Sequence, residues 1–261
     1  MDWRVLPTLS VAPCSSERTS PRQGSFFLAI SPHRASDGHH NRRTIGSKSE
    51  QEGVPDVQAS EQVPSIQIGE PGVTVEAGDH ICAFYPTLAE RDEILLPYLS
   101  EGMLAGEKCI AVLDTDDLDG IRQAVSGQGL PSTKDGNQLE LRRSRNAYLA
   151  NGSFETEAML KFWEDHVGAA VAEGFPFARV AGEMTWALSN LPGVDQLVSY
   201  EAKLNRLLPR YPQVILCLYE LERFDGEILV DVLKTHPKVL LGGMVLDNPY
   251  YMEPEEFLAS R

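Results

Sequence analysis

A histidine and a cysteine stand two residues apart in the stretch "HICAFY", at His80 and Cys82. The stretch is typical of a short buried strand, and alternate side chains of a strand point to the same face of a sheet. The pair can therefore ligate a metal ion or a haem iron, with His236 as a candidate third ligand. A hydrogen-bonded histidine beside an ordinary buried cysteine explains the same pattern. We prefer that interpretation, because the two-residue spacing is a weak motif, and we expect no resident metal or cofactor.

Two acids stand at the ends of predicted strands. Glu183 belongs to "GEMTW", where it can act as a general base or accept hydrogen bonds from a polar ligand, with Trp186 as a pocket wall. A helix-capping acid beside a core tryptophan fits the same residues. Glu220, in "YELERF", stands where the acid of a P-loop enzyme would lie, but a structural or hydrogen-bonding role is favoured when no phosphate loop accompanies it.

The turn after the first predicted strand lacks the residues of a phosphate-binding loop. It reads "FYPTLAERDE" and contains neither glycine nor lysine. A P-loop needs glycines so that backbone amides can wrap the phosphates, and a lysine for the terminal phosphates. No GxGxxG follows the strand, and no GxSxG elbow supports a serine nucleophile. Nucleotide hydrolysis and Ser-His-Asp catalysis are therefore both disfavoured, and we expect no enzymatic activity.

The candidate site residues lie in or beside apolar runs that alternate with amphipathic segments along the chain. Apolar runs without alternation are typical of strands buried on both faces, and the segments between them have helical spacing. The pattern predicts a three-layer, mostly parallel, doubly wound α/β sheet. Strands are expected at "HICAFY", "KCIAVLD", "LELRRS", "FARVAGEM", "QVILCLYEL" and "KVLLGGMVL". In the same interpretation "DNPYY" is a rigid turn after the last strand that closes one side of a pocket.

Composition excludes several functions. The chain has 261 residues and a formal charge of -15, and no cluster of Lys and Arg lies in the patterned part, so direct nucleic-acid binding is not expected. Residues 1–70 are rich in Ser, Pro, Arg and Gly and have no lasting pattern, which predicts a disordered leader before one domain at 71–261. No apolar run reaches the roughly 18 residues that cross a bilayer. The four cysteines contain no CxxC pair, as expected for reduced thiols in a cytoplasmic protein.

An ordered series of short motifs resembles the MEDS domain, the sensory domain of methanogen and methylotroph regulators. The matching stretches are "GDHICAFY", "LPYLSEGMLAGEKCIAVL", "GEMTWAL", "YEAKLN", "VILCLYELERFDGEILVDVLKTHPKVLLGG" and "NPYYMEPEEFL". The resemblance implies a RecA/KaiC-like fold with a degenerate P-loop. It also implies a regulatory module that binds a small molecule, with small hydrocarbons or related molecules proposed for the family. Such a module reports to a protein partner of the anti-sigma, histidine-kinase-like or transcription-regulator kind.

The resemblance also suggests which residues form the pocket. Aromatic walls with a few polar groups are what a small-molecule site requires. With Glu220 added from its strand-end position, the candidate set is His80, Cys82, Phe84, Tyr85, Glu183, Trp186, Glu220, His236, Pro237, Asn248 and Tyr251. Two alternatives stay open: a residual nucleotide-binding ATPase that uses Glu183 or Glu220, and a haem or metal sensor that uses His80, Cys82 or His236.

Overall fold

A computed structural model describes residues 66–67, 74–127 and 137–261. Internal contacts divide the chain into Met1–Val57 and Gln58–Arg261, and all described residues belong to the second unit. The predicted leader at 1–70 lies outside the described residues apart from Ile66–Gln67, which form strand β1. Strand β1 pairs antiparallel with β2, Thr74–Val75, in a small separate sheet.

The main sheet has seven strands in the order β5-β4-β6-β7-β3-β8-β9. Neighbouring strands from β5 to β8 run parallel, and only the last pair is antiparallel. The strands are β3 His80–Tyr85, β4 Lys108–Leu113, β5 Leu139–Arg143, β6 Ala178–Glu183, β7 Gln213–Glu220, β8 Lys238–Leu241 and β9 Met244–Asp247. The order places β3 between β7 and β8, so it is paired on both edges. This confirms the mostly parallel α/β sheet expected from the sequence.

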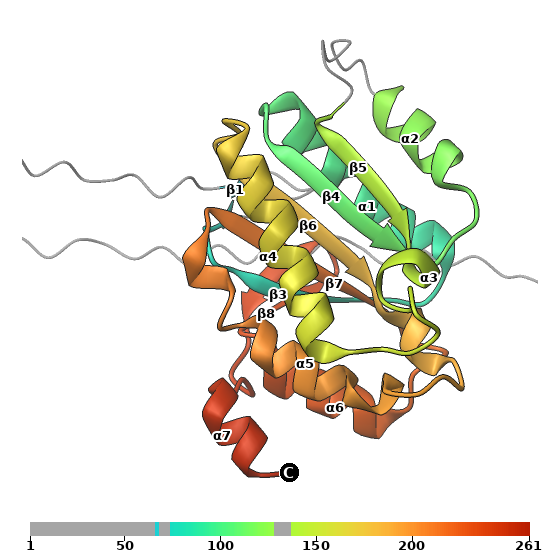
Figure 1. Ribbon diagram of the computed structural model, residues 1–261, viewed down its shortest axis with the longest axis vertical. Coiled ribbons are helices and arrows are strands. Elements are labelled where there is room, and N and C mark those ends of the chain that lie inside the picture. Colours follow the sequence, from blue (N-terminus) through green and yellow to red (C-terminus); the bar gives the residue numbers. More distant parts are fainter. Residues whose placement is uncertain (1–65, 68–73, 128–136) are drawn as a thin grey trace, which may run out of the picture. The chain divides into compact units, whose positions relative to one another are not determined.

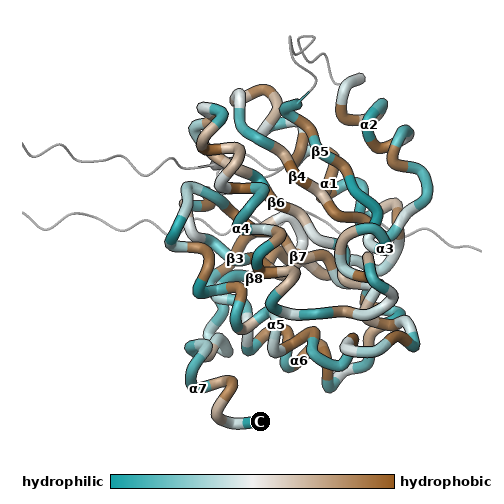
Figure 2. The backbone as a smooth tube through the Cα atoms, viewed as in Figure 1, coloured by the Kyte–Doolittle hydropathy of each residue, from teal (hydrophilic) through white to brown (hydrophobic). Residues whose placement is uncertain are grey.

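Helices cover both faces of the sheet (Figure 1). Helices α1 and α2 bury their apolar residues on one face, and α4, α5, α6 and α7 bury theirs on the other. The helices are α1 Leu88–Leu104, α2 Leu118–Ser126, α3 Ser144–Ala147, α4 Thr156–Ala172, α5 Leu197–Leu204, α6 Gly226–Thr235 and α7 Pro254–Ala259. Strands β4 and β7 are mostly hydrophobic along their length (Figure 2), as two-sided burial requires.

Polar side chains fix where three of these helices begin. Thr87, Asp117 and Asp225 are the N-caps of α1, α2 and α6, and each accepts a hydrogen bond from a backbone N–H in the first turn of its helix. These bonds satisfy donors that have no partner inside a helix. Each of these caps follows a parallel strand, so the caps also fix where the chain leaves the carboxyl edge of the sheet.

The stretch "KVLLGGMVL" forms two strands, whereas the sequence interpretation made it one. Strand β8 ends at Leu241, β9 begins at Met244, and these two residues are paired across the turn. Gly242 and Gly243 have φ values of 58° and 78°, which only glycine adopts easily. Two positive φ angles in a two-residue loop give the turn whose twist suits a hairpin. The glycine pair therefore reverses the chain and adds an antiparallel edge strand.

Gly102 lets α1 approach the sheet closely, and replacing it should destabilise the fold. A Cβ at this position would lie 2.7 Å from Arg179 Cδ and 2.7 Å from Cys109 Sγ. Arg179 is held by Glu107, whose carboxylate lies 2.6 Å from its Nε, so it cannot yield freely. We expect Gly102→Ala to lower the free energy of unfolding by about 1–3 kcal/mol, measured by urea denaturation. Gly226→Ala, where a Cβ meets nothing within 4 Å, is the matched control and should be nearly neutral.

Candidate functional site

Glu183 is the centre of a buried polar network at the carboxyl ends of the strands. It is the last residue of β6 and is 1% exposed. Its Oε1 accepts a hydrogen bond from the Tyr85 hydroxyl at 2.9 Å, and its Oε2 accepts one from the Asp114 backbone N–H at 2.8 Å. The Arg91 guanidinium, from the first turns of α1, lies 3.2 Å from the same carboxylate. One cation and two further donors therefore satisfy this acid.

Two neighbours extend the network. Asp114 follows β4, and its carboxylate accepts a hydrogen bond from the Thr185 hydroxyl at 2.8 Å. Burial, followed by the adjacent Glu183 carboxylate, raises the pKa of Tyr85, so its hydroxyl remains a hydrogen-bond donor. The side chains at this edge of the sheet are thus linked by hydrogen bonds. The Arg91 guanidinium reaches from α1 to the same strand ends.

Trp186 lies in the hydrophobic core and is 2% exposed. Its ring stacks on Tyr148 with centroids 4.6 Å apart, and Phe154 lies 4.4 Å away. Phe84 is partly buried beside Tyr219 at 6.1 Å. Trp186 and Phe84, two of the aromatic residues expected to form pocket walls, are therefore packed against other aromatic side chains.

Strand β3 divides the remaining predicted residues between the two faces of the sheet. His80, Cys82 and Phe84 face the layer of α4, α5 and α6, and for His80 and Cys82 this shared face was predicted from their spacing. Tyr85 faces the α1 layer together with Ile81. The structure thus does not bring the predicted set into a single pocket.

Four buried side chains converge on the α5 side of β3. They are His80 from β3, Glu201 from α5, Cys217 from β7 and His236, directly after α6. Their ligand atoms all lie within 4.8 Å of one another, and all four side chains are fully buried. His80 Nε2 lies 3.3 Å from Glu201 Oε2 and 3.3 Å from Cys217 Sγ. His236 Nε2 lies 3.6 Å from the same Glu201 oxygen.

The surrounding hydrogen bonds fix the tautomers of both histidines. The Asn205 amide nitrogen donates to the Thr235 carbonyl at 2.8 Å, which leaves its Oδ1 to accept from His80 Nδ1 at 3.1 Å. His236 Nδ1 faces the Val232 carbonyl at 2.8 Å, and a carbonyl can only accept. Both Nδ1 atoms therefore carry the proton, and both Nε2 lone pairs point into the cluster.

Burial controls the charge of the cluster. It lowers the pKa of His80 to about 3 and that of His236 to about 3, so both rings are neutral near pH 7. Burial also raises the pKa of Glu201, against the opposing influence of His236 and of the hydrogen bond from Tyr219. Neutral imidazoles with free Nε2 atoms are the form that ligates metal ions.

Sequence reasoning found two of the four members and missed Glu201 and Cys217. Cys217 is the direct pairing partner of Cys82 in the parallel register of β3 and β7, which the sequence does not reveal. Cys82 itself lies outside the cluster, because its Sγ faces the Lys238 carbonyl at 3.7 Å. A glutamate within the apolar segment "LVSYEAKL" was the available signal for Glu201.

The other predicted residues have structural contacts. Asn248 donates from its amide nitrogen to the carbonyls of Leu233 and His236 at 2.6 and 2.8 Å, and so holds the end of α6. Pro237 accepts a backbone hydrogen bond from Asn248. Glu220 ends β7 and pairs with Arg223 at 3.6 Å. Burial, together with nearby acids, raises the pKa of Tyr251 to about 12.

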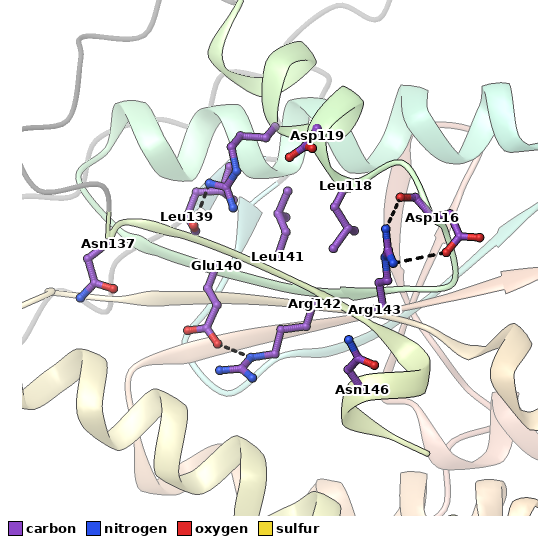
Figure 3. Close-up of a pocket in the computed structure, with 11 residues that line it drawn as sticks. Asp116, Leu118, Asp119, Asn137, Leu139, Glu140, Leu141, Arg142, Arg143 and Asn146 are labelled. Carbon is purple, nitrogen blue, oxygen red and sulfur yellow. Dashed lines mark hydrogen bonds and ion pairs between the residues drawn. The ribbon is translucent and has the colours of Figure 1, made fainter. Parts of the chain in front are cut away.

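Open cavities occur at the edge of the sheet formed by β5. A polar groove of about 700 Å³ lies between β5, α2 and α3 (Figure 3). A smaller hollow of about 100 Å³ adjoins it at the ends of β4 and β5 and includes Asp114. Asp116 and Arg143 line both, and the Arg143 guanidinium donates to the Asp116 carbonyl at 2.7 Å. None of the site residues predicted from the sequence lines the groove.

The parallel sheet with helices on both faces defines a KaiC-like α/β domain. A solved KaiC-like protein from the archaeon Pyrococcus horikoshii aligns with a TM-score of 0.50 and 16% identity, over 68% of this chain and 79% of its own. At this identity the likeness concerns the fold alone. The chain belongs to the MEDS family, the methanogen/methylotroph, DcmR sensory domain, because the sequence profile of that family matches residues 79–237. The family and fold expected from the sequence are thereby confirmed.

The similarity extends to a transcription regulator. The transcriptional repressor DcmR of Methylorubrum extorquens is 29% identical over 169 residues, which are 63% of this chain and 60% of the repressor. The chain therefore matches a little under two thirds of that relative's length. Within the described parts of the chain, no helix is both long and apolar enough to cross a membrane.

Proposed function

We propose that this MEDS domain is a non-catalytic sensor that binds a small polar molecule and reports to a regulatory protein. The observation that carries the proposal is the internal pairing of Glu183. Ligands of parallel α/β sheets bind outside the carboxyl ends of the strands, where an acid such as Glu183 would act. Here Arg91, Tyr85 and the Asp114 N–H already satisfy that carboxylate. Among the described residues, the network leaves Glu183 paired and so unsuited to act as a catalytic base.

The sequence of the β3–α1 turn supports the same conclusion. The turn carries neither the glycines nor the lysine of a phosphate-binding loop. Arg91, early in α1, directs its guanidinium to a carboxylate of the protein instead of an incoming phosphate. A protein with this arrangement retains the sheet of a nucleotide-binding domain while its own side chains occupy the strand ends.

The ligand site that fits best is the 100 Å³ hollow at the ends of β4 and β5. Arg143 and Arg145 pair there with Asp116 at 3.6 and 2.7 Å, and all three are at least one third exposed. A small molecule with an anionic or strongly polar group can compete for these guanidinium groups at little cost, because exposed ion pairs are weak. Asp114, which lines the hollow, donates its backbone N–H to Glu183. Ligand binding at the hollow would thus act on the Glu183 network through Asp114.

The regulatory output is proposed from the relative. The matching protein of Methylorubrum extorquens is a transcriptional repressor. The acidic chain, with a formal charge of -15, is unsuited to direct contact with DNA phosphates. We therefore assign the output to a contact with a second protein, of the transcription-regulator or anti-sigma and kinase kind.

Native mass spectrometry of the full chain, purified from its own cells, tests the proposal, together with an ATP hydrolysis assay. We expect a retained small molecule or a co-purifying protein, and no hydrolysis above that of Glu220→Gln. Arg143→Gln should reduce the retained mass, whereas Arg210→Gln, an exposed arginine remote from the hollow, should not. Hydrolysis that disappears in Glu220→Gln would overturn the proposal and favour a residual ATPase.

A further inference from the structure

We propose that His80, Glu201, Cys217 and His236 form a closed tetrahedral site for a Zn²⁺ ion. The site joins β3, β7, α5 and the segment after α6 inside the core. It departs from the sequence expectation of no resident metal, and it goes beyond the proposed sensory role. The two proposals rest on different residues and can fail separately.

Four of the six separations between ligand atoms match those around a tetrahedral zinc ion. Zinc binds nitrogen and oxygen at about 2.0–2.2 Å and sulfur at about 2.3 Å, so neighbouring ligand atoms lie roughly 3.3–3.8 Å apart. Glu201 Oε2 lies 3.3 Å from His80 Nε2, 3.6 Å from His236 Nε2 and 3.6 Å from Cys217 Sγ. His80 Nε2 and Cys217 Sγ are 3.3 Å apart. These four of the six separations lie in the zinc range, and all four ligand atoms lie within 4.8 Å of one another, so a small adjustment of His236 would bring them around one ion.

The lone pairs are directed for metal binding. Both histidines use Nδ1–H to donate to oxygen acceptors, which holds Nε2 unprotonated toward the cluster. Histidines that ligate metals commonly have this outer hydrogen bond, because it fixes the tautomer and the ring orientation. His236 Nε2 is buried and has no hydrogen-bond partner among the described residues. A buried nitrogen without a partner is costly in a metal-free core, and a metal ion would satisfy it.

An outer contact also positions the carboxylate. The Tyr219 hydroxyl donates to Glu201 Oε1 at 2.7 Å, which leaves Oε2 facing His80, Cys217 and His236. Glu201 is thus oriented by one oxygen and available as a ligand through the other. Cys82, on the adjacent strand, is outside this arrangement because its Sγ faces a backbone carbonyl.

The charges balance when zinc occupies the site. Two neutral imidazoles, one carboxylate and one thiolate carry two negative charges, which a divalent ion neutralises. Without a cation, two such buried groups would be neutralised by protonation instead. The combination of nitrogen, sulfur and a single carboxylate suits zinc, whereas magnesium and calcium prefer all-oxygen ligands. A haem would need an open slot around its iron, but all four ligands are fully buried.

The site has the properties of a structural zinc centre. Four protein ligands complete the tetrahedral shell and leave no position for a water or a substrate. The ligands come from positions 80 to 236, so the ion would connect the first and last parts of the domain. Because such a site is absent in the unfolded chain, the binding free energy contributes directly to folding.

The metal content of the tag-free full chain tests the proposal. We expect about one zinc ion per wild-type chain by inductively coupled plasma mass spectrometry. Cys217→Ser and His236→Gln should lose most of it, while Cys82→Ser and Cys109→Ser should retain it. These two controls remove buried thiols that the structure places outside the cluster. Tyr219→Phe should keep the four ligands but weaken zinc binding by about 10–100-fold in competition with a chelator.

Cobalt substitution of the wild-type chain keeps the test decisive if the ligand variants fail to fold. The protein is unfolded with a chelator, then refolded with Co²⁺ alone. We expect the intense visible bands of tetrahedral cobalt and a thiolate-to-cobalt band in the near ultraviolet. Wild-type protein without bound metal after purification, and without these bands after refolding with Co²⁺, would overturn the proposal. Retention of full zinc content by Cys217→Ser would overturn it as well.

Discussion

Replacing Arg91 with alanine is expected to lower the free energy of unfolding by about 3–5 kcal/mol. The change leaves the Glu183 carboxylate, which is 1% exposed, without its only cation in the described part of the chain. Tyr85 and the Asp114 N–H still donate to the carboxylate, but they carry no compensating charge. Breaking one side of a buried pair costs more than the pair itself contributes, because the remaining charge stays in the core. Urea denaturation followed by far-ultraviolet circular dichroism measures the loss.

The double variant Arg91→Ala/Glu183→Gln separates the charge from the packing. It should recover part of the lost stability, because a neutral amide can remain buried where an unpaired carboxylate cannot. Arg223→Ala is the matched control, since Arg223 is 48% exposed and pairs with Glu220 at 3.6 Å, so its loss should cost less than about 1 kcal/mol. An Arg91→Ala variant as stable as Arg223→Ala would mean that Arg91 does not hold the Glu183 carboxylate in the core, and Glu183 would then be free to act in catalysis.

Strand β3 supplies both polar clusters, one on each face of the sheet. Tyr85 belongs to the Glu183 network on the α1 side, and His80 belongs to the cluster with Glu201, Cys217 and His236 on the α5 side. Both clusters are buried and internally bonded, so they restrain the central strand at its two ends. One hydrogen bond between the Asp114 backbone N–H and Glu183 joins the end of β4, at the exposed hollow, to the end of β6.

Most of the fold could be predicted from the sequence, because it depends on local patterns. The apolar run of β7 and the capped start of α1 each indicate their structure within a few residues. The hairpin of β8 and β9 was missed although its Gly242–Gly243 pair is a recognised turn signal. Apolar residues stand on both sides of the glycine pair, and such a run is also typical of a single buried strand. The chain reversal was therefore not predicted.

The candidate sites depended on information that no local pattern contains. The spacing of His80 and Cys82 correctly placed both on one face, but only the register of β3 and β7 brings Cys217 beside them. Glu201 joins the cluster because α5 packs over these strands, which is a tertiary contact. Likewise, Arg91 reads as an ordinary helix residue until the fold brings it to Glu183. Residues that meet across layers therefore escaped sequence reasoning.

Trp186→Ala should lower the free energy of unfolding by about 3–5 kcal/mol, as expected when a large aromatic residue is removed from a core. The indole is 2% exposed and stacks on Tyr148, with Phe154 on another side. Because the indole is enclosed by other side chains, its removal creates an internal void that the neighbouring rings can fill only in part. Circular dichroism is the suitable probe for urea denaturation here, because fluorescence would change with the loss of the indole itself.

Trp186→Phe and Leu191→Ala bracket the expected effect. The phenylalanine variant keeps much of the stacking surface and removes an indole N–H that has no partner among the described residues. Its loss of unfolding free energy should therefore be less than half of the loss in Trp186→Ala. Leu191 is 37% exposed, and its truncation should cost no more than about 0.5 kcal/mol. If Trp186→Ala instead kept wild-type stability while losing a retained small molecule in native mass spectrometry, the indole would be a pocket wall. The ligand site would then lie on the α4 side of the sheet and not at the hollow beside β5.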